Sequence, residues 1–75
     1  MKTIRILKLT PTSVETLGEY TTQECRAFLS NAETIMSNMS DVYPHLVFIR
    51  GAYSVQLMDV NSGNTVLSYQ VALNL

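Results

Sequence analysis

The chain has 75 residues, a formal net charge of −1, one cysteine and one histidine. This length predicts a single domain over residues 1–75, and the hydrophobic fraction of 47% is ordinary for a globular protein. A single cysteine excludes an intrachain disulfide, and one cysteine with one histidine is too few for a structural zinc site. Near-neutral charge without a basic run argues against nucleic acid as the partner.

The sequence pattern predicts neither a membrane-spanning segment nor a targeting signal. No apolar run approaches the length needed to span a bilayer, so we expect no membrane-spanning segment. The first residues lead directly into an alternating run that contains Arg5 and Lys8, which does not resemble a signal peptide. Together with a free cysteine, this pattern predicts a cytoplasmic location.

The N-terminal segment predicts two strands, at residues 3–9 and 14–20, joined by a turn at Pro11. Two registers remain open. In the preferred register the pairs are Ile4 with Tyr20, Arg5 with Glu19, and Leu7 with Leu17. In the alternative register the pairs are Lys8 with Glu15 and Ile6 with Leu17. The first is preferred because it gives a salt pair on one face and an apolar cluster on the other.

A helix is predicted from about Thr22 to Asn38, ending near Ser40, with Pro44 soon after. Thr21 followed three residues later by Glu24 fits a capping box, which satisfies free amides at a helix start. Apolar residues then recur at helical spacing, forming one stripe: Cys25, Phe28, Leu29, Ala32, Ile35, Met36 and Met39. A single stripe means one buried face, so we expect the helix to lie across one side of a sheet.

Residues 45–50 form another strand-like run that ends at Gly51. Gly51 can act as a bulge inside one long bent strand, or as a turn between two strands. We favour the long bent strand, which would continue into the next alternating run.

Two alternating runs, at residues 53–60 and 64–71, predict the C-terminal hairpin. A three-residue loop, Asn61-Ser62-Gly63, closed by Val60 and Asn64, is expected because Gly63 can supply the left-handed conformation at the third position. The pairs would be Tyr53 with Val71, Ser54 with Gln70, Val55 with Tyr69, Gln56 with Ser68, and Leu57 with Leu67. This register makes one face apolar and the other mostly polar, and a one-residue slip would reverse the faces.

The predicted fold is therefore α+β, in the order β-β-α-β-β. An antiparallel sheet of about four strands carries one helix packed on one face. The third strand is long and bent, or split at Gly51. The helix would cover the face that includes Tyr53, Val55 and Leu57.

Residues that could act in catalysis or metal binding are isolated in the sequence. Cys25 lies on the apolar stripe and predicts a buried, unreactive thiol, while His45 has no spaced partner that would suggest a metal site or general base. The acidic residues are scattered, and Asp59 is expected to serve the following turn. No glycine-rich phosphate loop is present. We therefore expect no catalytic residues, no metal and no cofactor, and a protein that is not an enzyme.

The most suggestive feature is the second face of the sheet. It would combine apolar residues with uncharged polar ones, which is typical of the centre of a protein interface. The predicted partner-binding residues are Leu7, Leu17, Ser54, Gln56, Met58, Val66, Ser68 and Gln70. Leu9 would lie beside them. The alternative is a surface with scattered apolar residues, which is normal in globular proteins.

This combination predicts a small protein-binding module that acts as a regulator or inhibitor by steric occlusion of a partner protein. A homodimer or other homo-oligomer is expected, through the second sheet face or a sheet edge. The small size and lack of catalytic groups would suit a protein encoded by a phage or mobile element. One alternative is a nucleic-acid-binding regulator that uses Arg5, Lys8 and Arg50. Another is a structural subunit of a larger assembly.

Overall fold

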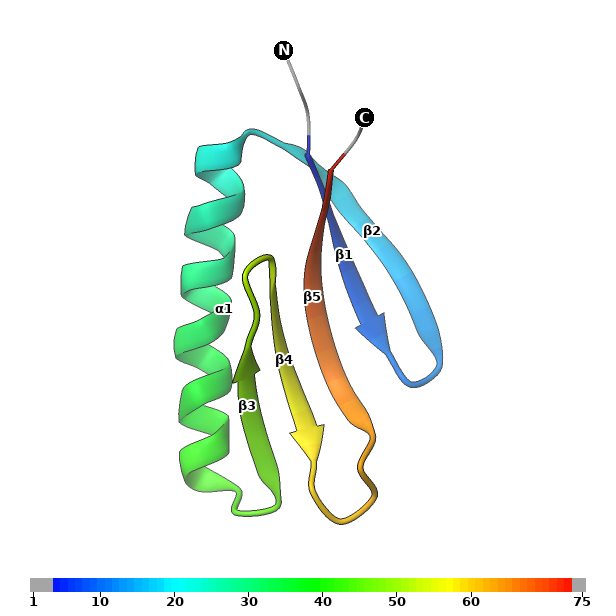
Figure 1. Cartoon of the computed structure of the whole chain (residues 1–75), viewed down its shortest axis with the longest axis vertical. Helices are drawn as coiled ribbons and strands as arrows, with labels where there is room; N and C mark the ends of the chain where they lie inside the picture. Colours follow the sequence, from blue (N-terminus) through cyan, green and yellow to red (C-terminus); the bar gives the residue numbers. More distant parts are fainter. Residues whose placement is uncertain (1–3, 74–75) are drawn as a thin grey trace.

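The computed structural model describes residues 4–73. The elements are β1 (Ile4–Thr10), β2 (Ser13–Tyr20), α1 (Thr22–Val42), β3 (Leu46–Arg50), β4 (Ser54–Asp59) and β5 (Thr65–Leu73). Within this range one antiparallel sheet has five strands in the order β2-β1-β5-β4-β3, and α1 lies on one side of it (Figure 1). The α+β class with one helix is confirmed, but the expected count of about four strands is one too low.

The additional strand arises at Gly51, where the favoured long bent strand is wrong. β3 and β4 are separate and pair antiparallel, with Phe48 opposite Leu57. The Gly51 amide donates to the Ser54 carbonyl at 2.9 Å and closes the turn. A β-carbon at Gly51 would lie 2.5 Å from the Ser54 hydroxyl, so any larger residue there would force that hydroxyl to rotate away. The turn reverses the chain so that β4 pairs with β3, and the helix can cover both strands.

The helix begins as predicted and ends slightly later than expected. The Glu24 amide donates to the Thr21 hydroxyl at 3.2 Å, and the Thr21 amide donates to the Glu24 carboxylate at 2.9 Å, which completes the capping box. The helix ends at Val42 rather than near Ser40. Tyr43 precedes Pro44, and a residue before proline is disfavoured in helical conformation, so the helix stops there.

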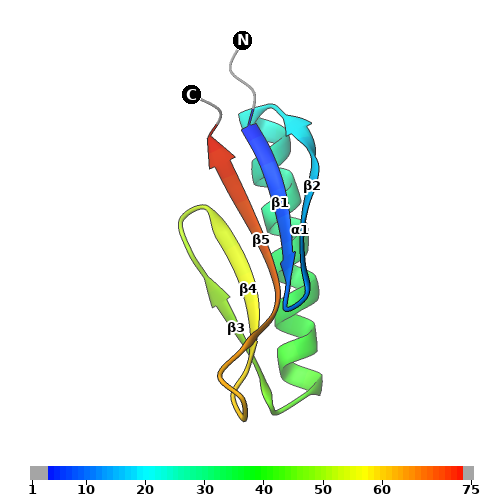
Figure 2. The same cartoon turned by 90° about the vertical axis from the view of Figure 1, so that its right-hand side faces the viewer.

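The core forms between α1 and the sheet. Figure 2 shows the strands in front of α1. One cluster joins the helix to the middle of the sheet and comprises Leu29, Ala32, Met36, Leu46, Val55 and Leu57. A second cluster at the helix start comprises Ile4, Ile6 and Cys25. Ile35, expected on the buried stripe, is 62% exposed, and it lines an open groove together with Met39 of α1 and Leu67 of β5.

The C-terminal hairpin has the predicted register along its strands. The pairs Ser54–Gln70, Val55–Tyr69, Gln56–Ser68 and Leu57–Leu67 are confirmed. The loop is longer than expected. The Asp59 backbone amide donates to the Asn64 carbonyl, and a register shift places Met58 opposite Thr65. Val66 is the extra residue of this bulge. Gly63 has φ +73°, as its position required.

Tyr53 does not lie in the core, in contrast to the expectation. Its carbonyl accepts from the Val71 amide at 2.8 Å, so the predicted pairing holds for the backbone. Its ring, however, is 66% exposed. Tyr53 belongs to the turn between β3 and β4, and this turn extends beyond the buried cluster formed by those two strands.

The N-terminal hairpin combines both registers considered from the sequence. Ile4–Tyr20 and Arg5–Glu19 follow the preferred register, whereas Lys8–Glu15 follows the alternative. A bulge between these parts leaves Leu17 without a partner, so Leu7 faces Thr16. Neither predicted pair that contained Leu17 forms. Gly18, with φ +148°, provides the backbone conformation next to the bulge.

Candidate functional site

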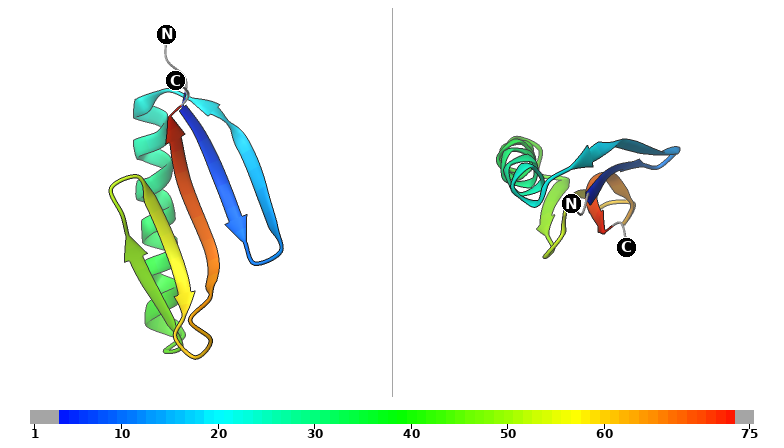
Figure 3. Two further views of the ribbon diagram at one scale, coloured as in Figure 1. Left: turned by 45° about the vertical axis from the view of Figure 1, so that its right-hand side comes forward. Right: turned by 90° about the horizontal axis from the view of Figure 1, so that it is seen from above.

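The sheet face turned away from α1 contains every predicted partner-binding residue except Leu17. We call it the open face and define it by Leu7, Leu9, Val47, Ile49, Ser54, Gln56, Met58, Val66, Ser68 and Gln70, with Arg5 and Glu19 at one end. Side chains alternate along a strand, and the residues between these ones pack toward the helix. The register places Leu7 beside Gln70, and Ser68 between Leu9 and Gln56. Figure 3 shows the strands that form this surface.

Leu17 lies on the other side of the sheet. It packs with Tyr20 against the cluster of Ile4, Ile6 and Cys25. The bulge is the physical reason, because an unpaired residue is freed from strict alternation and here turns toward the helix. Leu17 is therefore a partly buried residue on the helix side of the sheet and is removed from the candidate surface.

Two open-face residues were not predicted from the sequence. Val47 and Ile49 alternate along β3 with the helix-facing Leu46 and Phe48, and each is 37% exposed. They were missed because residues 45–50 were interpreted as the start of the following strand. The alternation of branched side chains within Leu-Val-Phe-Ile was the signal that could have found them.

The open face carries very little charge. Among the described residues, Arg5 and Glu19 are its only charged side chains, and their Nε and Oε1 atoms are 3.5 Å apart. The two charges are opposite, so the described part of the face has no net charge. Apolar groups with sparse charge resemble the centre of a protein interface more than a solvated sheet surface.

Ser68 lies at the centre of the open face and is only 2% exposed. Within the described part of the chain, its hydroxyl has no hydrogen-bond partner. The residue lines a depression of about 440 Å³ whose other walls are uncharged. These walls include Leu9, Thr10, Gln56, Thr65 and Gln70. The amide and hydroxyl groups here can both donate and accept hydrogen bonds, so the depression suits an uncharged polar group.

The residues with possible chemical roles are distant from this depression. Cys25 is buried, and its pKa lies above the ordinary value because burial disfavours the thiolate and the Glu24 carboxylate repels it. A raised pKa leaves less of the reactive thiolate. His45 is exposed and its ring meets the ring of Tyr43, with centroids 6.0 Å apart. Asp59 accepts from the Asn61 amide at 2.8 Å and thus serves the turn, as predicted.

Within residues 4–73, no group of three or more histidine, cysteine, aspartate and glutamate residues is placed to hold a metal ion. In the same range, no helix combines the length and the apolar character needed to cross a membrane.

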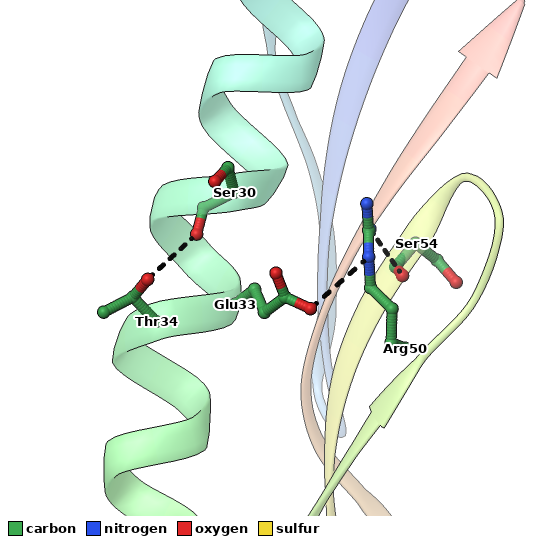
Figure 4. A network of polar contacts seen from close by, with 5 residues as sticks. All are labelled: Ser30, Glu33, Thr34, Arg50 and Ser54. Atoms are coloured by element: carbon green, nitrogen blue, oxygen red, sulfur yellow. Dashed lines mark hydrogen bonds and ion pairs between the residues drawn. The ribbon is translucent and has the colours of Figure 1, made fainter.

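The basic residues considered for nucleic-acid contact do not form one patch. Arg5 and Lys8 are an odd number of residues apart on β1, so their side chains leave opposite faces. Arg50 lies on β3, which β5 and β4 separate from β1. Its Nε atom is 3.8 Å from the Glu33 carboxylate, and its Nη1 atom donates to the Ser54 carbonyl at 3.3 Å (Figure 4).

Comparisons with known proteins gave no match to any protein-family model, curated protein or solved structure. The chemistry and geometry of this chain are therefore the basis for the functional proposal that follows.

Proposed function

We propose that this chain is a non-enzymatic protein-binding module that uses the open face, and that it regulates or inhibits a partner by covering the partner's functional surface. The observation that supports this most directly is the neutral, partly apolar character of the face. Among residues 4–73 its only charged residues are Arg5 and Glu19, which pair with each other. Three of its apolar members, Val47, Ile49 and Val66, remain 37–40% exposed.

The dimensions of the molecule agree with this role. The principal extents are 42 × 24 × 16 Å, and the strands run along the longest of them. A standard protein interface needs about 800 Å² from each partner, so an interface here would use most of the open face. A neutral surface can block a partner without performing any chemistry.

Self-association through the same face is part of the proposal. A two-fold interface brings identical patches together, so any unbalanced charge on the patch would repel itself. The open face avoids this because its charge is balanced. The free thiol of Cys25 supports action in a reducing compartment, and we include the cytoplasm in the proposal.

Sedimentation equilibrium of the pure protein tests self-association. We expect a dimer, and we expect Met58→Asp to dissociate it by placing an unpaired charge in the interface. Val60→Asp is the matched control, because Val60 lies in the β4–β5 turn and is 48% exposed. A wild-type protein that is monomeric at millimolar concentration, or a Met58→Asp protein that remains dimeric, would contradict this part of the proposal.

Binding of another protein is tested by using the same variants as baits. A partner of the open face should be captured by the wild type and by Val60→Asp, and lost with Met58→Asp. A protein captured equally by all three baits would bind elsewhere, and the open face would then not be the functional surface. Circular dichroism of each variant shows that the fold is retained.

A further inference from the structure

A separate cavity of about 560 Å³ opens on the helix side of the sheet. Figure 1 shows that the β3–β4 turn ends well short of the N-terminal end of α1. Residues from the first turns of α1, from β1 and β5, and from the β3–β4 turn line the cavity together. Its volume falls within the range of about 300–1,000 Å³ that is usual for small-molecule sites.

The floor of this cavity is apolar. Ile4, Cys25 and Leu29 line it and are 7%, 3% and 5% exposed, and Val71 of β5 completes it. These side chains belong to three different elements that the core holds together, so the floor is fixed before any ligand binds. Such a surface favours an apolar body of a ligand.

The rim of the cavity is cationic. Arg26 from α1 and Arg50 from the end of β3 both line it, and among the described residues Arg26 has no ion-pair partner. Thr22 also lines the cavity and is the first residue of α1, where the helix dipole adds partial positive charge. No carboxylate is among the lining residues. The rim thus attracts a negatively charged group.

Arg50 is held in place before a ligand arrives. Glu33 and the Ser54 carbonyl engage two positions of its guanidinium group, as Figure 4 shows. A guanidinium has five N–H donors, so others remain for a ligand. Tyr53, which is 66% exposed, also lines the cavity and offers an aromatic ring at its edge.

We infer that this cavity binds a small amphipathic anion, with an aromatic or aliphatic body on the apolar floor and a sulfonate, phosphate or carboxylate head between Arg26 and Arg50. This site is on the opposite side of the sheet from the open face, and it does not depend on the proposed function. The chain would then carry a small-molecule site and a protein-binding surface on its two sides.

The probe for this site is 8-anilinonaphthalene-1-sulfonate, followed by fluorescence and by titration calorimetry of the intact chain. We expect one site per chain. N-phenyl-1-naphthylamine, which has the rings without the sulfonate, and inorganic sulfate, which has no rings, should each bind at least about tenfold more weakly, because each lacks one of the two interactions. Binding of the sulfonate should weaken as salt is added.

Variants locate the site. Arg26→Gln should weaken binding of the sulfonate about five- to tenfold, as expected for loss of a charge-assisted hydrogen bond at a partly exposed site. Arg50→Gln should have a similar effect. Arg5→Gln is the matched control, because it removes one positive charge from the opposite side of the sheet and should leave the affinity unchanged.

Equal affinities for the wild type, Arg26→Gln and Arg5→Gln would overturn the inference, as would equal binding of the sulfonate and its uncharged analogue. Met58→Asp separates this inference from the proposed function. If the cavity is the site, Met58→Asp should bind the sulfonate as the wild type does, whether or not the variant still associates. Loss of binding in Met58→Asp alone would place the probe on the open face and contradict the cavity assignment.

Discussion

The two outer hairpins of the sheet differ in what covers them. In the β3–β4 hairpin, Leu46, Val55 and Leu57 are buried beneath Leu29, Ala32 and Met36 of α1. In the β1–β2 hairpin, Ile4 and Ile6 of β1 are buried next to the start of the helix, whereas no residue of β2 is buried. Seen from above, β1 and β2 extend away from α1 (Figure 3).

The covered hairpin therefore provides most of the stability, whereas the other hairpin mainly provides surface. The helix packs chiefly on β3 and β4, so most of the apolar burial is at that end of the sheet. The β1–β2 hairpin contributes Leu7 and Leu9 to the open face. Its only buried residues are Ile4 and Ile6, at the start of β1. Regions with few buried contacts open first, so β2 is expected to exchange its amide hydrogens before β4.

The largest effect is expected from truncating the covered hairpin. Leu57→Ala removes a fully buried side chain and should lower the free energy of unfolding by about 2–5 kcal/mol. Val14→Ala, on β2 at 68% exposure, should change it by no more than about 0.5 kcal/mol. Urea denaturation followed by circular dichroism measures both. Similar losses in the two variants would show that the hairpins are equally important for stability.

An intermediate effect of opposite sign is expected at Ser68. Its buried hydroxyl lacks a partner within the described residues, which costs stability. Ser68→Ala should therefore raise the free energy of unfolding by about 1 kcal/mol. Ser54→Ala, at a half-buried position of the same face, should change it by less than about 0.5 kcal/mol.

Both serine variants are compared in a Met58→Asp background, so that association does not contribute to the measured stability. Urea denaturation again gives the free energies of unfolding. A Ser68→Ala protein that is less stable than its background by 1 kcal/mol or more, by the same estimate, would mean that the hydroxyl has a stabilising partner.

The smallest effect is expected for the ion pair at the uncovered end. The side chains of Arg5 and Glu19 are 51% and 47% exposed, so water screens their attraction. A double-mutant cycle with Arg5→Gln and Glu19→Gln should give a coupling free energy of no more than about 0.5 kcal/mol, reduced further in 1 M salt. A coupling of several kcal/mol would indicate that this end of the sheet is much less solvated than the structure describes.

Short-range patterns in the sequence determined some features well. The alternation in residues 53–60 and 64–71 was sufficient for the β4–β5 register, because a slip would have placed Leu57 on the polar face. Thr21 and Glu24 were sufficient for the helix start, because the capping box is made within four residues.

Features that depend on long-range packing were not accessible from such patterns. The Leu17 bulge forms because an apolar side chain gains contact with Ile4, Ile6 and Cys25, which the local sequence of β2 does not reveal. For the candidate surface, alternation was enough to group Ser54, Gln56, Ser68 and Gln70. It could not show that Ser68 is enclosed, because its enclosure depends on neighbours from three strands.

The bulges also determine where the chain can change in length. The pairs Ile6–Gly18 and Leu7–Thr16 lie on either side of Leu17, so deletion of this single residue leaves both pairs in register. Deletion of Glu15 instead shifts the rest of β2 against β1 and turns its side chains to the other face. Val66 has the equivalent place in β5, between the partners of Leu57 and Met58. Each of these two hairpins therefore contains one position where a residue can be lost while the remaining pairs keep their register, and at Val66 the loss also removes one side chain from the open face.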